Sequence, residues 1–120
     1  MDYENLKRRT RKFALDVIKF VESLPKDDTC RMIGRQLLRA GTSVAANYRA
    51  VCRAKSTADF ISKFGTVEEE ADESGFWIDL LVDAKKVSPE KAAALIKESG
   101  ELTAIAVSSI NTARKTTRRS

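Results

Sequence analysis

The chain has 120 residues, 42% of them hydrophobic and 32% charged, which is typical of one globular domain with a heavily charged surface. It carries 22 Lys and Arg against 17 Asp and Glu, a net charge of +5, and it contains only two prolines and five glycines. The absence of histidine excludes every histidine-based catalytic scheme and most zinc sites. No segment approaches the roughly 18 apolar residues of a membrane span, and the N-terminus lacks a signal-peptide core, so we expect a cytoplasmic protein.

Two helices are predicted in the first half of the chain from apolar spacing and capping signals. The first runs from about Tyr3 to Leu24, where the following proline ends it. The second begins at Asp27 or Asp28, either of which is a good N-cap, and runs to about Lys55. The buried seam of the first helix is predicted as Tyr3, Leu6, Thr10, Phe13, Val17, Phe20 and Leu24. That of the second is predicted as Ile33, Leu37, Ala40, Val44, Asn47, Val51 and Ala54.

Two further helices are predicted in the second half. Ser56 and Asp59 resemble a capping box that opens the third helix, and Ser88 before Pro89 is an N-cap that begins the fourth, expected to end at about Ala113. The third seam is predicted as Phe60, Phe64, Val67, Ala71, Ser74, Ile78 and Leu81. The fourth is predicted as Ala92, Ile96, Ser99, Leu102 or Thr103, Ala106, Ile110 and Ala113.

Four long helices with short connections force neighbouring helices to be antiparallel. The predicted fold is therefore all-α, an antiparallel up-down-up-down four-helix bundle that forms one domain over residues 1–113, followed by a frayed basic tail at 114–120. Small residues on the second helix permit close approach of another helix, in the bundle or in a neighbouring subunit, but they are also ordinary helix formers. They are Gly34, Ala40, Gly41, Ala45, Ala46 and Ala50.

Asn47 is a polar residue on an otherwise apolar seam, with Ser43 one turn before it. In an antiparallel pair, both are predicted to face Glu70 and Glu73 of the third helix, and Arg39 is placed to pair with Glu73. We interpret the four as a structural hydrogen-bond network that sets the helix register. The alternative is a polar pocket. Two carboxylates without a histidine or a nucleophile motif are weak support for catalysis, so we predict no catalytic, metal or cofactor site and expect no enzyme.

Basic residues are concentrated near both ends of the chain. Because the first helix starts where the fourth ends in an up-down bundle, we expect one basic pole, which would match a phosphate backbone. The alternative is a solvated helix face. No aromatic stacking platform or RNP-type motif indicates sequence-specific readout. The predicted nucleic-acid-binding residues are Lys7, Arg8, Arg9, Arg11, Lys12, Arg49, Arg53, Lys55, Arg114, Lys115, Arg118 and Arg119.

The segments GTSVAANYRA and RAKSTADFISKFGTVEEEADESGFWIDLL resemble the bacterial four-helix-bundle proteins encoded in intervening sequences of 23S ribosomal RNA genes. The resemblance covers nearly the whole chain and implies a homopentamer, arranged as a ring, with no established enzymatic activity. Related accessory proteins of diversity-generating retroelements share the architecture and bind nucleic acid and a reverse transcriptase through a basic surface. The positions that match the family pattern are Ser43, Asn47, Arg49, Arg53, Ser56, Asp59, Phe60, Lys63, Glu70, Glu73 and Trp77.

These observations together predict a non-enzymatic, oligomeric helical bundle that binds RNA or single-stranded nucleic acid. Binding would be electrostatic and would read shape rather than sequence. The alternative function is a protein-interaction adaptor, whose homo-oligomeric ring recruits a partner protein while the basic pole plays no part.

Overall fold

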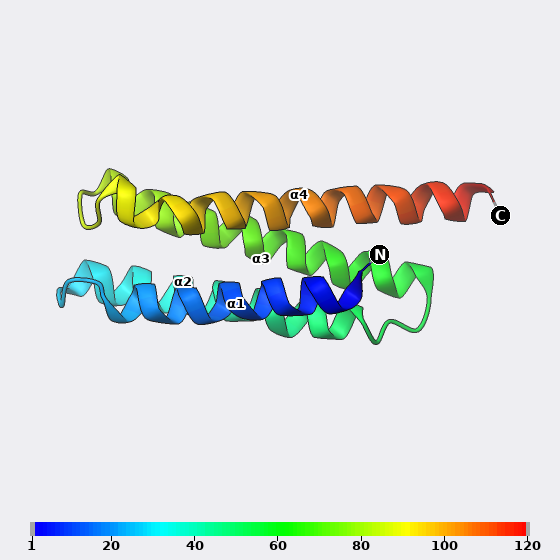
Figure 1. Ribbon diagram of the computed structural model, residues 1–120, viewed down its shortest axis with the longest axis horizontal. Coiled ribbons are helices and arrows are strands. Elements are labelled where there is room, and N and C mark those ends of the chain that lie inside the picture. The colour runs from blue at the N-terminus through cyan, green and yellow to red at the C-terminus, as the bar shows by residue number, and fades with distance from the viewer. Residues whose placement is uncertain (1, 120) are drawn as a thin grey trace.

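The computed structural model describes residues 2–119, with side chains described as far as Thr117. These residues form α1 (Tyr3–Glu22), α2 (Asp28–Val51), α3 (Thr57–Asp83) and α4 (Pro89–Arg119). Each helix runs opposite to the one before it and packs along it, whereas α1 and α4 contact each other over a short stretch (Figure 1). The predicted all-α, up-down-up-down four-helix bundle is confirmed.

The residues predicted to cap α2, α3 and α4 do so. The side chain of Asp27 accepts a hydrogen bond from the backbone N–H three residues later at 2.8 Å. Ser56 accepts the equivalent bond at 3.0 Å and Ser88 at 3.2 Å. Each cap satisfies one of the N–H groups that the first turn of a helix leaves without a partner.

Three helix ends differ from the prediction. α1 ends at Glu22, before the predicted end, and α2 ends at Val51 rather than near Lys55. The carboxylate of Asp59 accepts a hydrogen bond from the Lys55 N–H at 2.9 Å, so the start of α3 holds this residue outside α2. α4 does not end at about Ala113 as predicted but continues to Arg119, through a segment that contains neither proline nor glycine.

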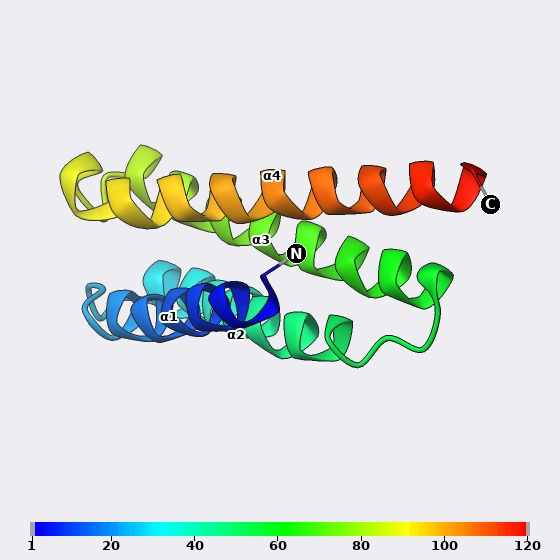
Figure 2. The same cartoon turned by 45° about the vertical axis from the view of Figure 1, so that its right-hand side comes forward.

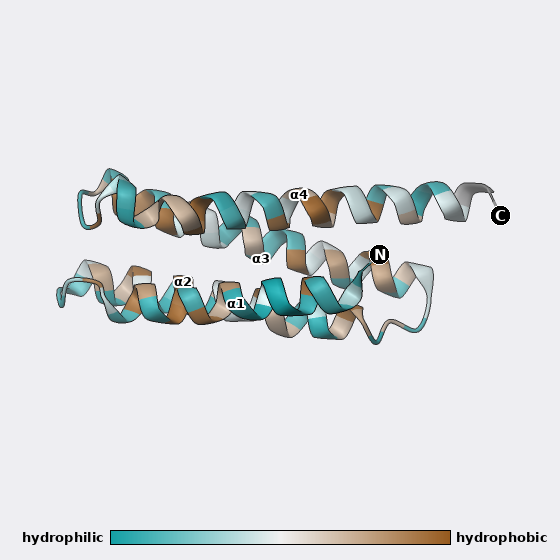
Figure 3. Ribbon diagram, viewed as in Figure 1, coloured by the Kyte–Doolittle hydropathy of each residue, from teal (hydrophilic) through white to brown (hydrophobic). Residues whose placement is uncertain are grey.

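The core follows most of the predicted seams. Hydrophobic and hydrophilic residues alternate along all four helices (Figure 3). On α2, however, Tyr48 is fully buried and Asn47 lies half-buried at the edge of the seam. The Tyr48 ring packs against Phe64 with ring centroids 5.6 Å apart. An exact alternation of three and four residues drifts around a helix of 3.6 residues per turn, and the larger aromatic side chain takes the core position.

The two glycines of α2 allow α1 to approach closely. A Cβ atom built at Gly41 would lie 2.8 Å from the side chain of Val17, and one at Gly34 would lie 3.3 Å from Val21. Contacts under 3.0 Å require the neighbour to move. At these two positions the small residues therefore serve packing within the bundle.

Both views place the α2–α3 connection and the end of α4 at the same end of the molecule, and α1 starts part-way along the bundle from that end (Figures 1 and 2). We call this the basic end, because the predicted nucleic-acid-binding residues lie on the helix segments that lead to it. It occupies one end of a bundle 53 Å long and about 22 Å wide.

Candidate nucleic-acid interface

Three of the predicted cations line one groove between α1 and α2. Lys7 and Arg11, one turn apart on α1, face Arg49 of α2 across a cavity of about 300 Å³. Among the described side chains, Arg11 and Arg49 form no ion pair, and the Lys7 ammonium is 3.5 Å from the exposed carboxylate of Glu4. An ion pair so exposed and long adds little, so the charge of all three cations is open to a ligand.

Tyr48 contributes to the wall of this groove, and the sequence analysis did not identify it. Burial, with a hydrogen bond to Cys52, raises the pKa of Tyr48 above the usual range for a phenol. The residue therefore stays neutral and does not offset the positive charge beside it. The sequence did contain a signal for it, because the aromatic Tyr48 directly follows Asn47, a polar residue at a predicted core position.

Two of the predicted cations are used within the protein. Arg9 reaches from α1 to α4, where its guanidinium donates to Glu98 at 2.6 and 3.1 Å and to Glu101 at 3.1 Å. Lys12 pairs with Asp16 at 2.6 Å on its own helix. The hydrogen bond to Glu98 raises the pKa of Arg9, and that to Asp16 raises the pKa of Lys12. Arg9, with its side chain 29% exposed, is thus held within the protein, whereas Lys12 stays 77% exposed and its ion pair contributes little.

The remaining predicted cations lie around the basic end. Arg53 and Lys55 are in the α2–α3 connection, and five members of the set are exposed without an ion pair among the described side chains. The predicted residues Arg118 and Arg119 have side chains outside the described part. The five exposed cations are Arg8, Arg53, Lys55, Arg114 and Lys115.

A second cavity, of about 480 Å³, opens at the basic end itself. Tyr3 of α1, Ala54 of the α2–α3 connection, Phe60 of α3 and Ala113 of α4 all line it, with Lys55 also in its wall. The first four were predicted to form the last layer of the buried seam, but none is buried. The two alanines are too small to fill the layer between the aromatic rings, and it stays open to solvent. We call it the end cavity.

A larger cavity, of about 600 Å³, lies elsewhere, between α1 and α4. Its base includes Phe13, Phe20 and Leu95, which are almost fully buried. Lys12, already paired with Asp16, is the one predicted site residue that lines it. Lys19 and Lys91 also line this cavity, so its three cations lie together with the carboxylates of Asp16 and Glu98.

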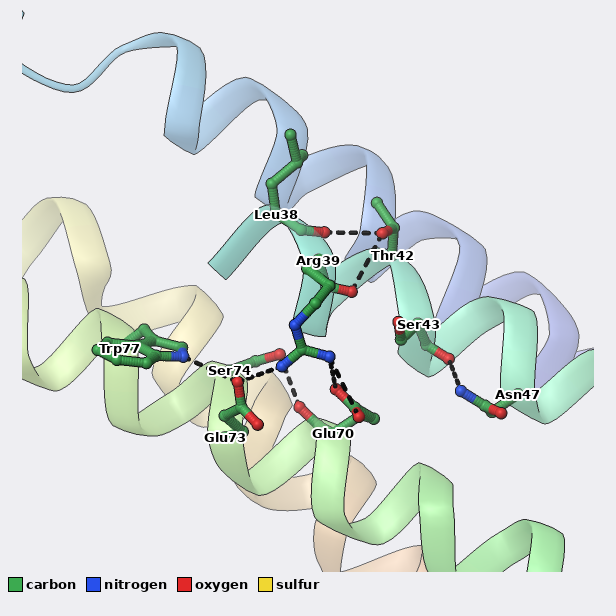
Figure 4. Close-up of polar contacts among 9 residues, drawn as sticks. All are labelled: Leu38, Arg39, Thr42, Ser43, Asn47, Glu70, Glu73, Ser74 and Trp77. Atoms are coloured by element: carbon green, nitrogen blue, oxygen red, sulfur yellow. Dashed lines mark hydrogen bonds and ion pairs between the residues drawn. The ribbon is translucent and has the colours of Figure 1, made fainter. Parts of the chain in front are cut away.

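Arg39 joins α2 to α3 through two carboxylates (Figure 4). Its guanidinium lies 3.1 Å from Glu70 and also donates to Glu73, as predicted from the helix register. Glu73 accepts a second hydrogen bond from the indole N–H of Trp77 at 3.0 Å. This indole hydrogen bond, with the one from Arg39, lowers the pKa of Glu73.

Asn47 does not join this interhelical group. Its side-chain amide donates to the backbone carbonyl of Ser43 at 2.8 Å, within α2, and Figure 4 shows the two groups of contacts apart. The four residues predicted as one network are thus divided, with Glu70 and Glu73 bound to Arg39 instead. The physical reason is reach, because a long arginine on the edge of α2 spans to both carboxylates whereas the short amide finds an acceptor one turn away.

No group of three or more Cys, Asp or Glu side chains in the described part is arranged to hold a metal ion. Cys30 and Cys52 are both free thiols, the first buried and the second half-buried. None of the helices within residues 2–119 is both long and apolar enough to cross a membrane.

Comparison with known families decides the relationship that the sequence motifs suggested. The family described as 23S rRNA-intervening sequence protein matches residues 5–108, nearly the full bundle. The chain belongs to this family. The 23S rRNA-intervening sequence family match includes the groove cations from Lys7 to Arg49, and it does not extend to Tyr3 or to the last turns of α4.

A solved structure supports the same relationship. The chain is similar to a crystal structure from Bacteroides thetaiotaomicron, described as a protein with unknown function from the S23 ribosomal protein family. The two are 29% identical, with a TM-score of 0.85, over 92% of this chain and 99% of that one. No protein with a curated description matches this member of the 23S rRNA-intervening sequence family.

Proposed function

We propose that this protein binds RNA or single-stranded nucleic acid through the basic end and that it has no enzymatic activity. The observation that carries the proposal is the convergence of Lys7, Arg11 and Arg49 on one groove with no carboxylate across it. A groove lined by cations on two helices suits consecutive phosphates of one strand, whose binding releases counterions.

The distribution of the carboxylates supports the same location. Arg9 and Arg39 each bind two glutamates of a neighbouring helix, so these arginines act inside the protein. The groove cations and the exposed cations near them keep their charge for a partner. The excess charge of the chain is therefore effective mainly at one end.

Fluorescence anisotropy with a labelled single-stranded RNA, repeated at several salt concentrations, tests the proposal. The variant Lys7→Gln, Arg11→Gln, Arg49→Gln removes three charges from the groove. We expect weaker binding and a salt slope shallower by roughly 2, since each phosphate contact on a single strand contributes about 0.7. A structured ribosomal RNA fragment and a DNA strand of the same length show which nucleic acid is preferred.

The matched control is Lys26→Gln, Arg35→Gln, Lys97→Gln, which removes the same charge from exposed positions outside the basic end. It should leave the salt slope close to that of the natural protein. Absence of binding near physiological salt would refute the proposal. Equal effects of the two triple variants would show that net charge, rather than the groove, determines affinity.

We also propose that copies of the chain associate, as a homopentamer in keeping with the family resemblance. Support comes from an exposed apolar stripe formed by Met32 of α2 with Phe76 and Leu80 of α3, which are 56%, 55% and 36% exposed. The Arg39 contacts set a register that makes Met32 level with this part of α3. Exposed apolar groups of this kind mark interaction surfaces.

Light scattering with Phe76→Ser, Leu80→Ser tests the association. The natural protein should have about five times the chain mass at micromolar concentration, and the double variant should have a lower mass. A natural protein that is monomeric would refute the homopentamer, and the stripe would then favour the adaptor function, with another protein as its partner.

A further inference from the structure

The end cavity lies where the four helices would form one more layer of the core, but the side chains at these positions do not fill it. Its apolar positions repeat the spacing of the seams below it, yet Tyr3 is 43% exposed and Phe60 is half-exposed. Ala54 and Ala113 complete the layer with single methyl groups. The result is a space open to solvent, with both apolar and polar lining, bordered by two aromatic side chains contributed by α1 and α3.

The wall of the end cavity also carries polar groups suited to an anionic ligand. Lys55 contributes an ammonium group, and Ser56 and Thr57 contribute hydroxyls at the start of α3. The nearby carboxylate of Asp59 is occupied, since it pairs with Lys63 at 2.8 Å and accepts the Lys55 N–H. The ligand that matches these groups has a flat apolar ring and a negative charge beside it.

The end cavity and the groove lined by Lys7, Arg11 and Arg49 follow one another along α1 and α2. Tyr3, Lys7 and Arg11 follow one another at intervals of four residues, so they share one face of α1 over about 12 Å. On the opposite side, Arg49 lines the groove and Cys52 lines the end cavity one turn later. A strand whose phosphates lie against the groove would therefore reach the end cavity with its next bases.

We propose that the end cavity takes one unpaired nucleobase, stacked against Tyr3 and Phe60, while Lys55 and the groove cations hold the adjoining phosphates. This inference rests on the proposed function. It adds a site for the base of the nucleotide, which cations that bind phosphates do not recognise. The cavity volume of about 480 Å³ falls in the range of small-molecule sites, roughly 300 to 1,000 Å³. Aromatic stacking accepts every base, so the site distinguishes single strands from duplexes without reading sequence.

The experiment compares two variants that act in opposite ways. Tyr3→Ala removes one stacking ring, and Ala113→Leu fills the cavity with an apolar side chain that favours a helix. Each should lower the affinity for a single-stranded RNA about tenfold, the equivalent of roughly 1.4 kcal/mol, with the salt slope unchanged. Affinity for an RNA duplex of the same length should not change.

Two controls distinguish stacking from general effects. Tyr3→Phe keeps the ring and should bind like the natural protein. Leu15→Ala removes an exposed apolar side chain elsewhere on α1 and should have no effect.

A strand carrying one 2-aminopurine gives a direct readout of stacking, because its fluorescence should be quenched on binding to the natural protein and less so with Tyr3→Ala. Thermal unfolding verifies that each variant is folded.

The outcomes separate this inference from the proposed function. If the cation triple variant loses binding while Tyr3→Ala and Ala113→Leu bind single strands like the natural protein, the nucleobase site is refuted and the proposed function stands. If the natural protein binds no nucleic acid, both are refuted. Equal losses on single strands and duplexes would also overturn the nucleobase site, because a duplex offers no unpaired base.

Discussion

Arg39 and Arg49 lie on the same helix, and the structure gives them opposite surroundings. Arg39 faces α3, where Glu70 and Glu73 bind it from one turn to the next. Arg49 faces α1, where Lys7 and Arg11 add positive charge and no carboxylate lies across the groove. The first arginine links two helices, and the second remains available to a ligand.

The role of a surface arginine in this bundle therefore depends on the helix across from it. The segment of α3 opposite Arg39 is rich in glutamate, and the start of α1 opposite Arg49 is rich in lysine and arginine. A charge-assisted hydrogen bond stabilises the fold only where the acceptor is within reach. Cations that face cations destabilise slightly until an anion binds between them.

The largest effect is expected beneath the cationic groove, where Tyr48 rather than any cation provides stability. Tyr48→Ala should lower the free energy of unfolding by about 3 to 5 kcal/mol, because it leaves a cavity beside Phe64. Tyr48→Phe keeps the ring and should cost about 1 kcal/mol. Urea unfolding measures both, and a mild effect of Tyr48→Ala would mean that this side of the bundle is not well packed.

A smaller effect is expected from exchanging the two arginines for glutamine. Arg39→Gln should destabilise the protein by about 1 kcal/mol, because Glu70 and Glu73 lose a shared partner on a half-exposed surface. Arg49→Gln should change stability by less than about 0.5 kcal/mol. Denaturant midpoints compare the two variants directly, and equal values would contradict the assignment of different roles.

The Arg39 group should also make stability depend on pH. The hydrogen bond from Trp77, with that from Arg39, places the pKa of Glu73 in the folded protein below its ordinary value of 4.5. As pH falls, Glu73 is therefore protonated in the unfolded chain before it is protonated in the folded protein. Its contribution to the free energy of unfolding is present above about pH 4.5 and is lost below it.

Unfolding measured from pH 7 down to pH 2.5 tests this dependence with Glu73→Gln. The stability difference between the natural protein and the variant should shrink as pH falls through the acidic range. Glu69→Gln, at an exposed position on α3 without an ion pair among the described side chains, is the control. A difference that stays constant with pH would show that the Glu73 carboxylate contributes by shape rather than by charge.

The smallest effect is expected at Asn47, which was predicted to set the register between α2 and α3. Asn47→Ala removes one hydrogen bond to a carbonyl of the same helix, and alanine is the better helix former. We expect a change below about 0.5 kcal/mol by thermal unfolding. A loss of 2 kcal/mol or more would restore the interhelical role.

Local periodicity and side chains three or four residues apart were enough to predict the fold class, the cap of each helix from α2 to α4 and most of the core. The sequence also predicted the Arg39–Glu73 pair, since an antiparallel pair joined by a short connection has a fixed register. The basic end followed from the order of the helices alone.

Which residues fill each interface and which leave it open depends on contacts between helices that are far apart in the sequence. Tyr48 replaced Asn47 in the core, since the rotation of α2 depends on its contacts with α1 and α3 together. Arg9 was withdrawn from the basic set by Glu98 of α4, whose distance a sequence does not show, whereas the Lys12–Asp16 pair spans four residues of one helix and was predictable. The end cavity depends on the sizes of side chains from distant segments, which meet only when all four helices are assembled.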